Sequence, residues 1–201
     1  MGRTSDARER LMQAAGELWH TRSYGDVGVS EICDRAGVQK GSFYHFFPSK
    51  EDLALSAFED YWQREIQPEM EQIFAPSVPP LERLQRWCDA ILADQREFFE
   101  RHGRVPGCPL CTLGSEAGPQ SERLRRKAEE LLERGQFHLV KTIEDAQRAG
   151  LVAAGDPQTK ARLLTHVMLG AELEARVQND LAPLEHLGPL LLEALGARRT
   201  A

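Results

Sequence analysis

The sequence predicts an all-α fold of about nine helices. Apolar residues recur at the spacing of a helix face along most of the 201 residues, and no segment has the alternation or β-branched content of a strand. Two segments interrupt this periodicity most clearly: residues 75–80, which are rich in proline, and residues 102–119, which are rich in glycine and proline. We therefore expect two domains, a small one of three helices in residues 1–48 and a larger helical one in residues 49–201.

The small domain begins with a helix that is predicted from about Ser5 to a turn at residues 24–26. One face of this helix carries apolar residues at i, i+4 and i+7: Leu11, Ala15 and Leu18. Two short helices follow over residues 29–36 and 40–46, and Pro48 interrupts the chain after them. The three-residue connection between the two short helices predicts a compact corner.

The helices of the larger domain are predicted from cap and break signals. Ser49 is the expected N-cap of a helix that runs to about Phe74, with a bend at Pro68. Asp156 is followed by a proline, which is a typical helix start. We predict the remaining helices over residues 80–101, 120–149, 157–179 and 183–195, with a short one within residues 102–119.

The charge distribution narrows the classes of function. A net charge of −6 argues against a protein that coats nucleic acid without sequence preference. Residues 1–50 hold seven Lys and Arg against six Asp and Glu. This first quarter is therefore about neutral, which permits contact with DNA but does not require it.

Membrane and export signals are not found in the sequence. No apolar run approaches the ~18 residues that cross a bilayer, and the first ten residues, MGRTSDARER, contain no apolar signal segment. We therefore expect a cytoplasmic protein with no membrane partner. Four cysteines in such a chain are expected to be free thiols: Cys33, Cys88, Cys108 and Cys111.

The segment from Val29 to Leu53, VSEICDRAGVQKGSFYHFFPSKEDL, has the pattern of a helix-turn-helix. Ile32 and Ala36 lie one turn apart in the first helix and can face the second. Gly37 follows, where the turn needs a residue that tolerates a positive φ. The second helix has an aromatic anchor at i, i+3 and i+4: Phe43, Phe46 and Phe47. These features alone also fit a tight helical corner with an aromatic core.

The opposite face of the second helix carries side chains suited to DNA. Gln39 and Lys40 lie at its N-terminus, where they can reach base edges in the major groove, and Gly41 leaves room for close approach. Three further side chains suit phosphate oxygens: Ser42, Tyr44 and His45. Lys50, in the first turn of the next helix, is also expected to contact a phosphate, together with the free backbone N–H groups there.

The same segment resembles the DNA-binding domain of the TetR family of repressors. The matching residues are Val29, Ile32, Ala36-Gly37-Val38, Lys40 to Phe46, Ser49-Lys50-Glu51 and Leu53. Gly28 departs from the pattern because the family usually has Thr or Ser as the N-cap there, although Gly is tolerated. The resemblance implies a homodimer that binds a near-palindromic double-stranded DNA operator and leaves it when an effector binds. It also implies that residues 49–201 bind that effector and form the dimer.

Two C-terminal helices carry apolar and small residues that could pack in the four-helix bundle of such a dimer. These residues are Leu164, Met168, Gly170 and Ala171 in one helix, and Leu187, Leu190, Leu191 and Leu195 in the other. The same spacing would also suit faces that pack inside one monomer.

The segment HGRVPGCPLCTLGSEAG, residues 102–118, resembles the middle of the ligand domain in a subgroup of these regulators. The matching residues are Gly107, Cys108, Leu113 and Glu116. Cys111 does not belong to the pattern. In several members the cysteine after this glycine is associated with sensing reactive electrophiles such as quinones, aldehydes or acrylate-like compounds. The resemblance therefore implies a small-molecule or electrophile effector that acts at Cys108.

The residues themselves leave several chemistries open at Cys108 and Cys111. Near the N-terminus of a short helix, Cys108 would ionise more easily and act as a nucleophile. The two cysteines could instead close a disulfide on oxidation, or bind a thiophilic metal with His102, Cys88 or His138. Both could also be small apolar core residues. No second Cys-x-x-Cys motif supports a metal, so we predict neither a metal site nor a cofactor.

Two further hypotheses concern a role of Arg176 in effector sensing and an enzymatic function. Arg176 could stabilise a nearby thiolate or bind an anionic effector, or it could be an exposed or ion-paired residue. A thiol–disulfide oxidoreductase that uses Cys108 and Cys111 would need a βαβ scaffold, and only helical patterns surround these residues. We therefore predict a DNA-binding transcriptional regulator that is not an enzyme. Its candidate effector-sensing residues are Cys108, Cys111 and Arg176.

Overall fold

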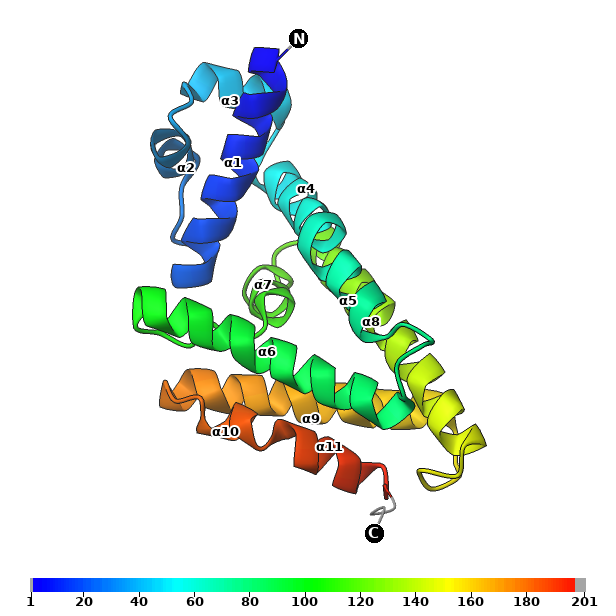
Figure 1. Cartoon of the computed structure of the whole chain (residues 1–201). Coiled ribbons are helices and arrows are strands. Elements are labelled where there is room, and N and C mark those ends of the chain that lie inside the picture. The colour runs from blue at the N-terminus through cyan, green and yellow to red at the C-terminus, as the bar shows by residue number, and fades with distance from the viewer. Residues whose placement is uncertain (1, 198–201) are drawn as a thin grey trace. The chain divides into compact units, whose positions relative to one another are not determined.

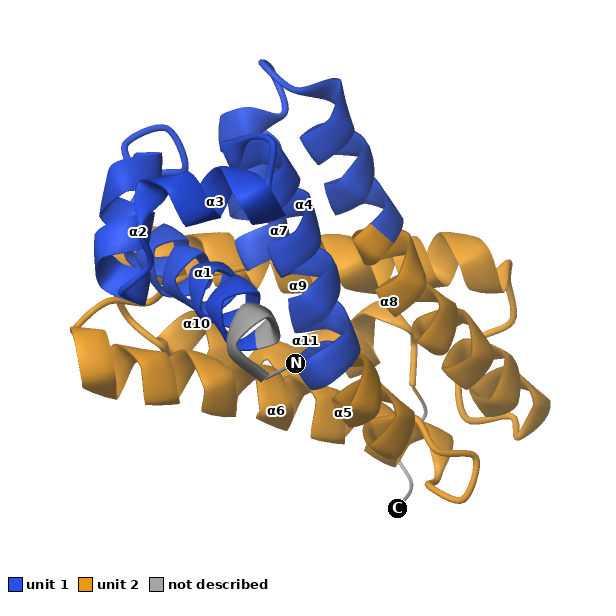
Figure 2. Cartoon of the chain, turned by 90° about the horizontal axis from the view of Figure 1, so that it is seen from above, with its two compact units in different colours: residues 1–66, 109–130 blue, residues 67–108, 131–201 orange. Residues whose placement is uncertain are grey.

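The computed structural model describes residues 2–197, and these form eleven α-helices and one π-helical turn, with no strand. The predicted all-α class is confirmed. The described chain folds as two compact units (Figure 2). Unit 1 takes in residues 109–130 besides the N-terminal part through Ile66, and unit 2 contains residues 67–108 and the chain from Leu131 onward. The boundaries of these compact units therefore differ from the domain boundary that we predicted after residue 48, which divided the chain by role.

Unit 1 begins with the three helices that the sequence predicts (Figure 1). These are α1 (Gly2–Thr21), α2 (Val29–Ala36) and α3 (Lys40–Phe46). The first helix starts before Ser5 and ends before the predicted turn at residues 24–26. Gly37 follows α2 with a φ of 62°, so the predicted left-handed turn residue is confirmed. Gly28 is the N-cap of α2 and offers no side-chain hydrogen bond, which makes this helix start weaker than a Ser or Thr cap would.

The core of unit 1 holds α3 by its aromatic side chains. Phe43 and Phe47 are 0% and 2% exposed, and Phe46 is half-buried against the same core. Two elements distant in sequence, α7 (Pro109–Ala117) and the start of α8 (Glu122–Arg148), contribute to this core. Their buried residues are Leu113, Ala117 and Leu124. The predicted aromatic anchor therefore exists, and its core extends beyond the first four helices.

The helix predicted over residues 49–74 is three consecutive elements without an intervening loop. They are α4 (Lys50–Tyr61), the π-helical turn η1 (Trp62–Ile66) and α5 (Gln67–Ile73). Ser49 caps α4 as predicted, because its side chain accepts a hydrogen bond from a backbone N–H of the first turn. Pro68 has no N–H for the carbonyl group of Arg64, and the wide π-helical turn just before Pro68 accommodates this loss. A π-helical turn thus lies just before Pro68, where the sequence predicts a bend.

Unit 2 is built mainly from long helices (Figure 1). Its elements after α5 are α6 (Pro80–His102), the rest of α8, α9 (Pro157–Gln178), α10 (Ala182–Glu185) and α11 (Leu187–Ala194). Both α6 and α9 pack against α10 and α11. The helix predicted over residues 183–195 is divided at His186. Among the described residues, no helix is long and apolar enough to span a membrane.

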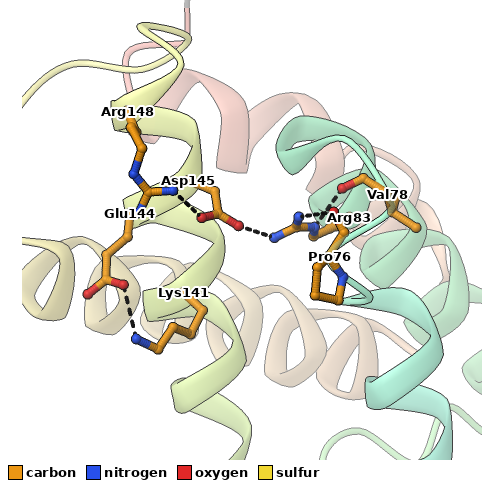
Figure 3. A network of polar contacts seen from close by, with 7 residues as sticks. All are labelled: Pro76, Val78, Arg83, Lys141, Glu144, Asp145 and Arg148. Carbon is orange, nitrogen blue, oxygen red and sulfur yellow. Dashed lines mark hydrogen bonds and ion pairs between the residues drawn. The ribbon is translucent and has the colours of Figure 1, made fainter.

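A buried arginine links α6 to α8 within unit 2 (Figure 3). The Arg83 side chain is only 5% exposed, and its guanidinium donates to Asp145 Oδ2 at 2.6 Å. Two more of its N–H groups reach the carbonyl oxygens of Val78 and Pro76, at 2.7 and 3.1 Å. The hydrogen bond from Arg83, with a smaller contribution from Arg148, lowers the pKa of Asp145. Through Arg83, this network connects the segment before α6 to Asp145 of α8.

Candidate nucleic-acid interface and effector-sensing segment

The surface of α3 and its N-cap carries the predicted DNA-reading residues. The exposed ones are Gln39, Lys40, Gly41, Ser42, Tyr44 and His45. Tyr44 is 52% exposed while its ring contacts the buried ring of Phe43 edge-on, with 5.1 Å between the ring centroids. A Cβ atom at Gly41 would meet no atom within 4 Å, so this part of the helix faces open space. The local fold therefore presents these polar groups together, with the aromatic anchor on the other side.

A groove of ≈ 480 Å³ lies beside this surface, between α3 and α1. Its lining from the turn and α3 is Gly37, Val38, Gln39, Gly41, Ser42, His45 and Phe46, and α1 contributes Ala7 and Arg10. Arg10 donates from its guanidinium to the carbonyl oxygen of Ala36 at 3.0 Å, at the end of α2. The sequence did not predict a role for Arg10, because the packing of α1 against α3 depends on residues that are distant in sequence. Arg10 thus adds a cation to the predicted set.

Lys50 has a position that sequence reasoning did not foresee. Its ammonium group donates to the carbonyl oxygens of Tyr24 and Val27, at 2.8 and 3.0 Å, in the turn between α1 and α2. The same nitrogen lies 4.2 Å from the centroid of the Tyr24 ring. Burial lowers the pKa of Lys50. The side chain therefore stabilises the turn that leads into α2, and its contact with a phosphate stays a prediction.

Cys108 immediately precedes Pro109, the first residue of α7, which is the position that the nucleophile hypothesis requires. Cys108 and Cys111 are both half-buried, and neither forms a disulfide. Cys108 is the last residue of unit 2 before the chain enters unit 1, whereas Cys111 lies in unit 1, in the first turn of α7. The two cysteines therefore belong to different compact units.

The residue before Cys108 is held by contacts from α6 and α9. Gly107 has a φ of 68°, and its N–H donates to Gln95 Oε1 at 3.0 Å while its carbonyl accepts from Gln95 Nε2 at 3.3 Å. A Cβ atom on Gly107 would lie 3.2 Å from the Arg176 side chain, so only glycine fits here without a shift. The stem of Arg176 thus lies beside the predicted sensing segment, and the residue is exposed. Sequence reasoning missed Gln95, whose role depends on a contact across the fold.

Glu172 is a buried carboxyl group in the same cluster. It is 6% exposed, and its Oε1 accepts a hydrogen bond from Gln95 Nε2 at 3.3 Å. Its Oε2 is buried without a hydrogen-bond partner in the described part of the chain. Burial raises the pKa of Glu172 well above its usual value, and the charges of Cys108 and Asp94 raise it further. The sequence did not identify this residue, because a glutamate one turn before Arg176 is typical of an exposed helix face.

The other two cysteines are structural. Burial raises the pKa of Cys88 to about 12 and also raises the pKa of Cys33 above its usual value. Both side chains are buried, so we assign them to the core. His138, one of the suggested metal ligands, packs against the Phe74 ring with 5.5 Å between centroids, and burial lowers its pKa. Within residues 2–197 no group of three or more His, Cys, Asp or Glu side chains could hold a metal ion.

The residues predicted for the dimer interface require a correction. Most of them are buried inside unit 2: Leu164, Ala171, Leu187, Leu191 and Leu195. Four large apolar side chains on these helices are exposed, at 43 to 77%: Leu163, Leu173, Val177 and Leu190. Of these four, only Leu190 was among the predicted interface residues. Both faces of α9 carry apolar residues, and spacing alone cannot tell which face the monomer buries. Gly170, also predicted, is exposed, and a Cβ there would meet no atom within 4 Å.

The helix-turn-helix geometry agrees with comparisons to known proteins. The model of bacterial regulatory proteins of the tetR family matches residues 11–57, and that of the tetracyclin repressor-like C-terminal domain matches residues 80–189. The chain belongs to the tetR family. Its members bind DNA operators and act as dimers, so this tetR-family protein is a DNA-binding transcriptional regulator and not an enzyme. The oxidoreductase alternative for Cys108 and Cys111 is not supported.

Relatives of this tetR-family chain are similar over most of their length. Transcriptional regulator AcuR of Cereibacter sphaeroides is 32% identical over 89% of this chain and 80% of its own. HTH-type transcriptional repressor NemR of Escherichia coli is 28% identical over 90% of this chain and 89% of its own. The crystal structure of the reduced form of NemR has a TM-score of 0.81 and 27% identity, covering 96% of this chain and 100% of that one. The predicted family and fold are thereby confirmed.

Proposed function

We propose that the protein is a repressor that binds a near-palindromic operator as a homodimer, with α3 of each copy in a major groove. The observation that carries this proposal is the exposed polar surface of α3, backed by a buried aromatic anchor. The repressor role is supported by the similarity to NemR, a transcriptional repressor. A repressor of this kind works in the cytoplasm, where its operator lies.

We propose that the two copies meet through the exposed apolar face of α9. Leu163, Gly170 and Val177 follow one another at intervals of seven residues on this helix, and Leu173 lies between the last two. Such spacing keeps one seam of a helix facing a partner helix. Small Gly170 allows close approach of that partner. Apolar side chains at 62 and 77% exposure, Leu173 and Val177, favour a covered face over one left in water.

We propose that an electrophile or oxidant releases the repressor by modifying Cys108. Support comes from the position of its half-buried thiol directly before α7, and from the turn that Gln95 holds at Gly107. Arg176 and Cys111 are the further residues of this proposed sensing segment. The relative NemR has a reduced form, which favours a redox-sensitive thiol in this protein as well.

The reading surface is tested by removing its polar groups. Lys40→Ala and Tyr44→Phe are each expected to weaken binding to an operator selected from random DNA by about 5- to 100-fold, because each removes one contact to a base or phosphate. Lys141→Ala removes an exposed cation of unit 2 and is the control, with an expected change below about twofold. Gel-shift titration at fixed salt measures all three. Parental affinity in both α3 variants would overturn the assignment of the reading helix.

The sensing thiol is tested by treating the operator complex with a quinone or an aldehyde. Release of DNA is expected from the parent and from Cys111→Ser, and loss of release from Cys108→Ser, if a single thiol forms an adduct. Equal loss in both serine variants would instead indicate a disulfide between the two cysteines. Intact mass measured in parallel identifies the adduct. Release from Cys108→Ser as complete as from the parent would show that Cys108 is not the trigger.

A further inference from the structure

Glu116 of α7 binds the turn between α1 and α2, inside unit 1. Its Oε2 accepts one hydrogen bond from the Ser23 hydroxyl at 2.8 Å and a second from the Tyr24 N–H at 3.0 Å. Hydrogen bonds to a charged carboxylate are stronger than neutral ones. Glu116 is separated from its partners by about ninety residues, so the contact belongs to the tertiary fold. The turn that leads into the helix-turn-helix is thus attached directly to α7.

The same turn is held from α4 by Lys50. While Glu116 takes the N–H of Tyr24, the ammonium of Lys50 takes the carbonyl oxygens of Tyr24 and Val27. Both backbone groups of Tyr24 are therefore fixed by charged side chains from different helices. Val29 begins α2 shortly after this turn, and α2 packs against α3. The turn is therefore connected to the reading helix through α2.

The segment that carries Glu116 is itself anchored to α4 by ion pairs. Arg123 contacts Glu51 and Asp52, each at 2.8 Å, and Lys127 contacts Glu59 at 3.0 Å. The buried residues of α7 belong to the same core as α1 to α4. The residues from α7 through the start of α8 are therefore built into the DNA-reading unit, although the sequence assigned them to the effector domain.

We propose that Glu116 is a positioning residue for operator recognition, which fixes the α1–α2 turn and thereby the orientation of α2 and α3. The inference rests on the proposed function for its effect on DNA, and on the geometry of unit 1 for the contact itself. Because α7 begins at the residue after Cys108, a change at Cys108 that shifts α7 acts on Glu116 and on the turn it holds.

Hydrogen exchange tests the contact without DNA. Glu116→Leu removes the oxygen that accepts both hydrogen bonds and is expected to speed amide exchange of residues 22–28 about tenfold, whereas Glu116→Gln keeps an acceptor oxygen and is expected to change the exchange rate less. Glu129→Gln is the control, because it removes an equal charge from an exposed position of α8 in the same unit. Ser23→Ala also removes the hydrogen bond that the Gly25 N–H donates to the Ser23 hydroxyl, at 3.3 Å, so it is expected to speed exchange in both backgrounds, and more in the parent than in Glu116→Leu. Exchange of residues 22–28 at the parental rate in Glu116→Leu would overturn the proposal.

Binding to DNA then separates positioning from plain destabilisation. Loss of a negative charge by itself strengthens binding to DNA, so Glu129→Gln is expected to bind slightly tighter. Glu116→Leu is expected to lose about tenfold in affinity for the selected operator while its affinity for random DNA stays within twofold, because the basic groups are unchanged. Faster exchange with an unchanged preference for the operator would refute the positioning role. A parent protein without operator preference would refute the proposed function, and the exchange data would still decide the contact.

Discussion

Replacement of Arg83 by methionine is expected to lower the free energy of unfolding by about 3 kcal/mol. The guanidinium of Arg83 has three protein acceptors, the carbonyl oxygens of Val78 and Pro76 and the carboxylate of Asp145. Methionine fills a similar volume but satisfies none of these acceptors, so the carbonyl oxygen of buried Val78 would lose its hydrogen bond and the two part-buried acceptors would lose theirs. Asp145 is one-third exposed and retains Arg148, which keeps the loss below that of a fully buried charge.

Arg86 provides the matched control on the same helix. Its side chain is 50% exposed and pairs only with Glu82 among the described contacts, one turn earlier in α6. Arg86→Met is expected to change the free energy of unfolding by no more than about 0.5 kcal/mol. Urea unfolding followed by circular dichroism measures both variants. If Arg83→Met were as stable as Arg86→Met, the buried network would not be a source of stability.

A second large effect is expected from pH through Glu172. Its raised pKa means that the folded protein keeps a proton on Glu172 that the unfolded chain releases near the usual value of about 4.3. The contribution of this residue to stability is therefore fully present below that value and is lost as pH rises through the folded pKa. The expected loss is up to about 1.4 kcal/mol per pH unit in that window.

Glu172→Gln removes this titration and keeps an oxygen that can accept the hydrogen bond from Gln95. The variant is expected to match the parent near pH 4 and to become the more stable of the two as pH rises towards 7. Glu174→Gln removes an exposed carboxyl from the same helix and is expected to keep the parental pH dependence, since water solvates that group in both states. Free energies of unfolding at each pH unit give the comparison. Parallel curves for parent and Glu172→Gln would contradict the assignment of a buried, protonated carboxyl.

The DNA-reading surface could be predicted from the sequence because its determinants are local. Gly37 occupies the one turn position that needs a positive φ, and the spacing of Phe43 and Phe47 decides which face of α3 is buried. The exposed positions between them follow from the same helical period. Ser49 and Asp156 cap their helices as predicted, since a cap is a contact between residues three apart.

The two apolar faces of α9 show where prediction from helical spacing fails. The helix predicted over residues 157–179 has apolar residues on two faces, and the spacing of these residues does not indicate which face the monomer buries. The tertiary packing of α9, which contacts α10 and α11, decides that Leu164 and Ala171 lie inside unit 2 while Leu173 and Val177 are exposed. The residues predicted for the interface were therefore mostly core residues.

The sequence by itself determined the helices, the helix-turn-helix and the polar face of α3, because each depends on residues within about two turns of one another. The tertiary structure alone decided what the charged and buried groups do: Lys50 binds the α1–α2 turn, Glu116 holds its other side, and Gln95 with Glu172 fixes the residue before Cys108. The partners in these contacts lie 12 to 93 residues apart. No spacing rule specifies such pairs, since the chain brings them together only when its helices pack.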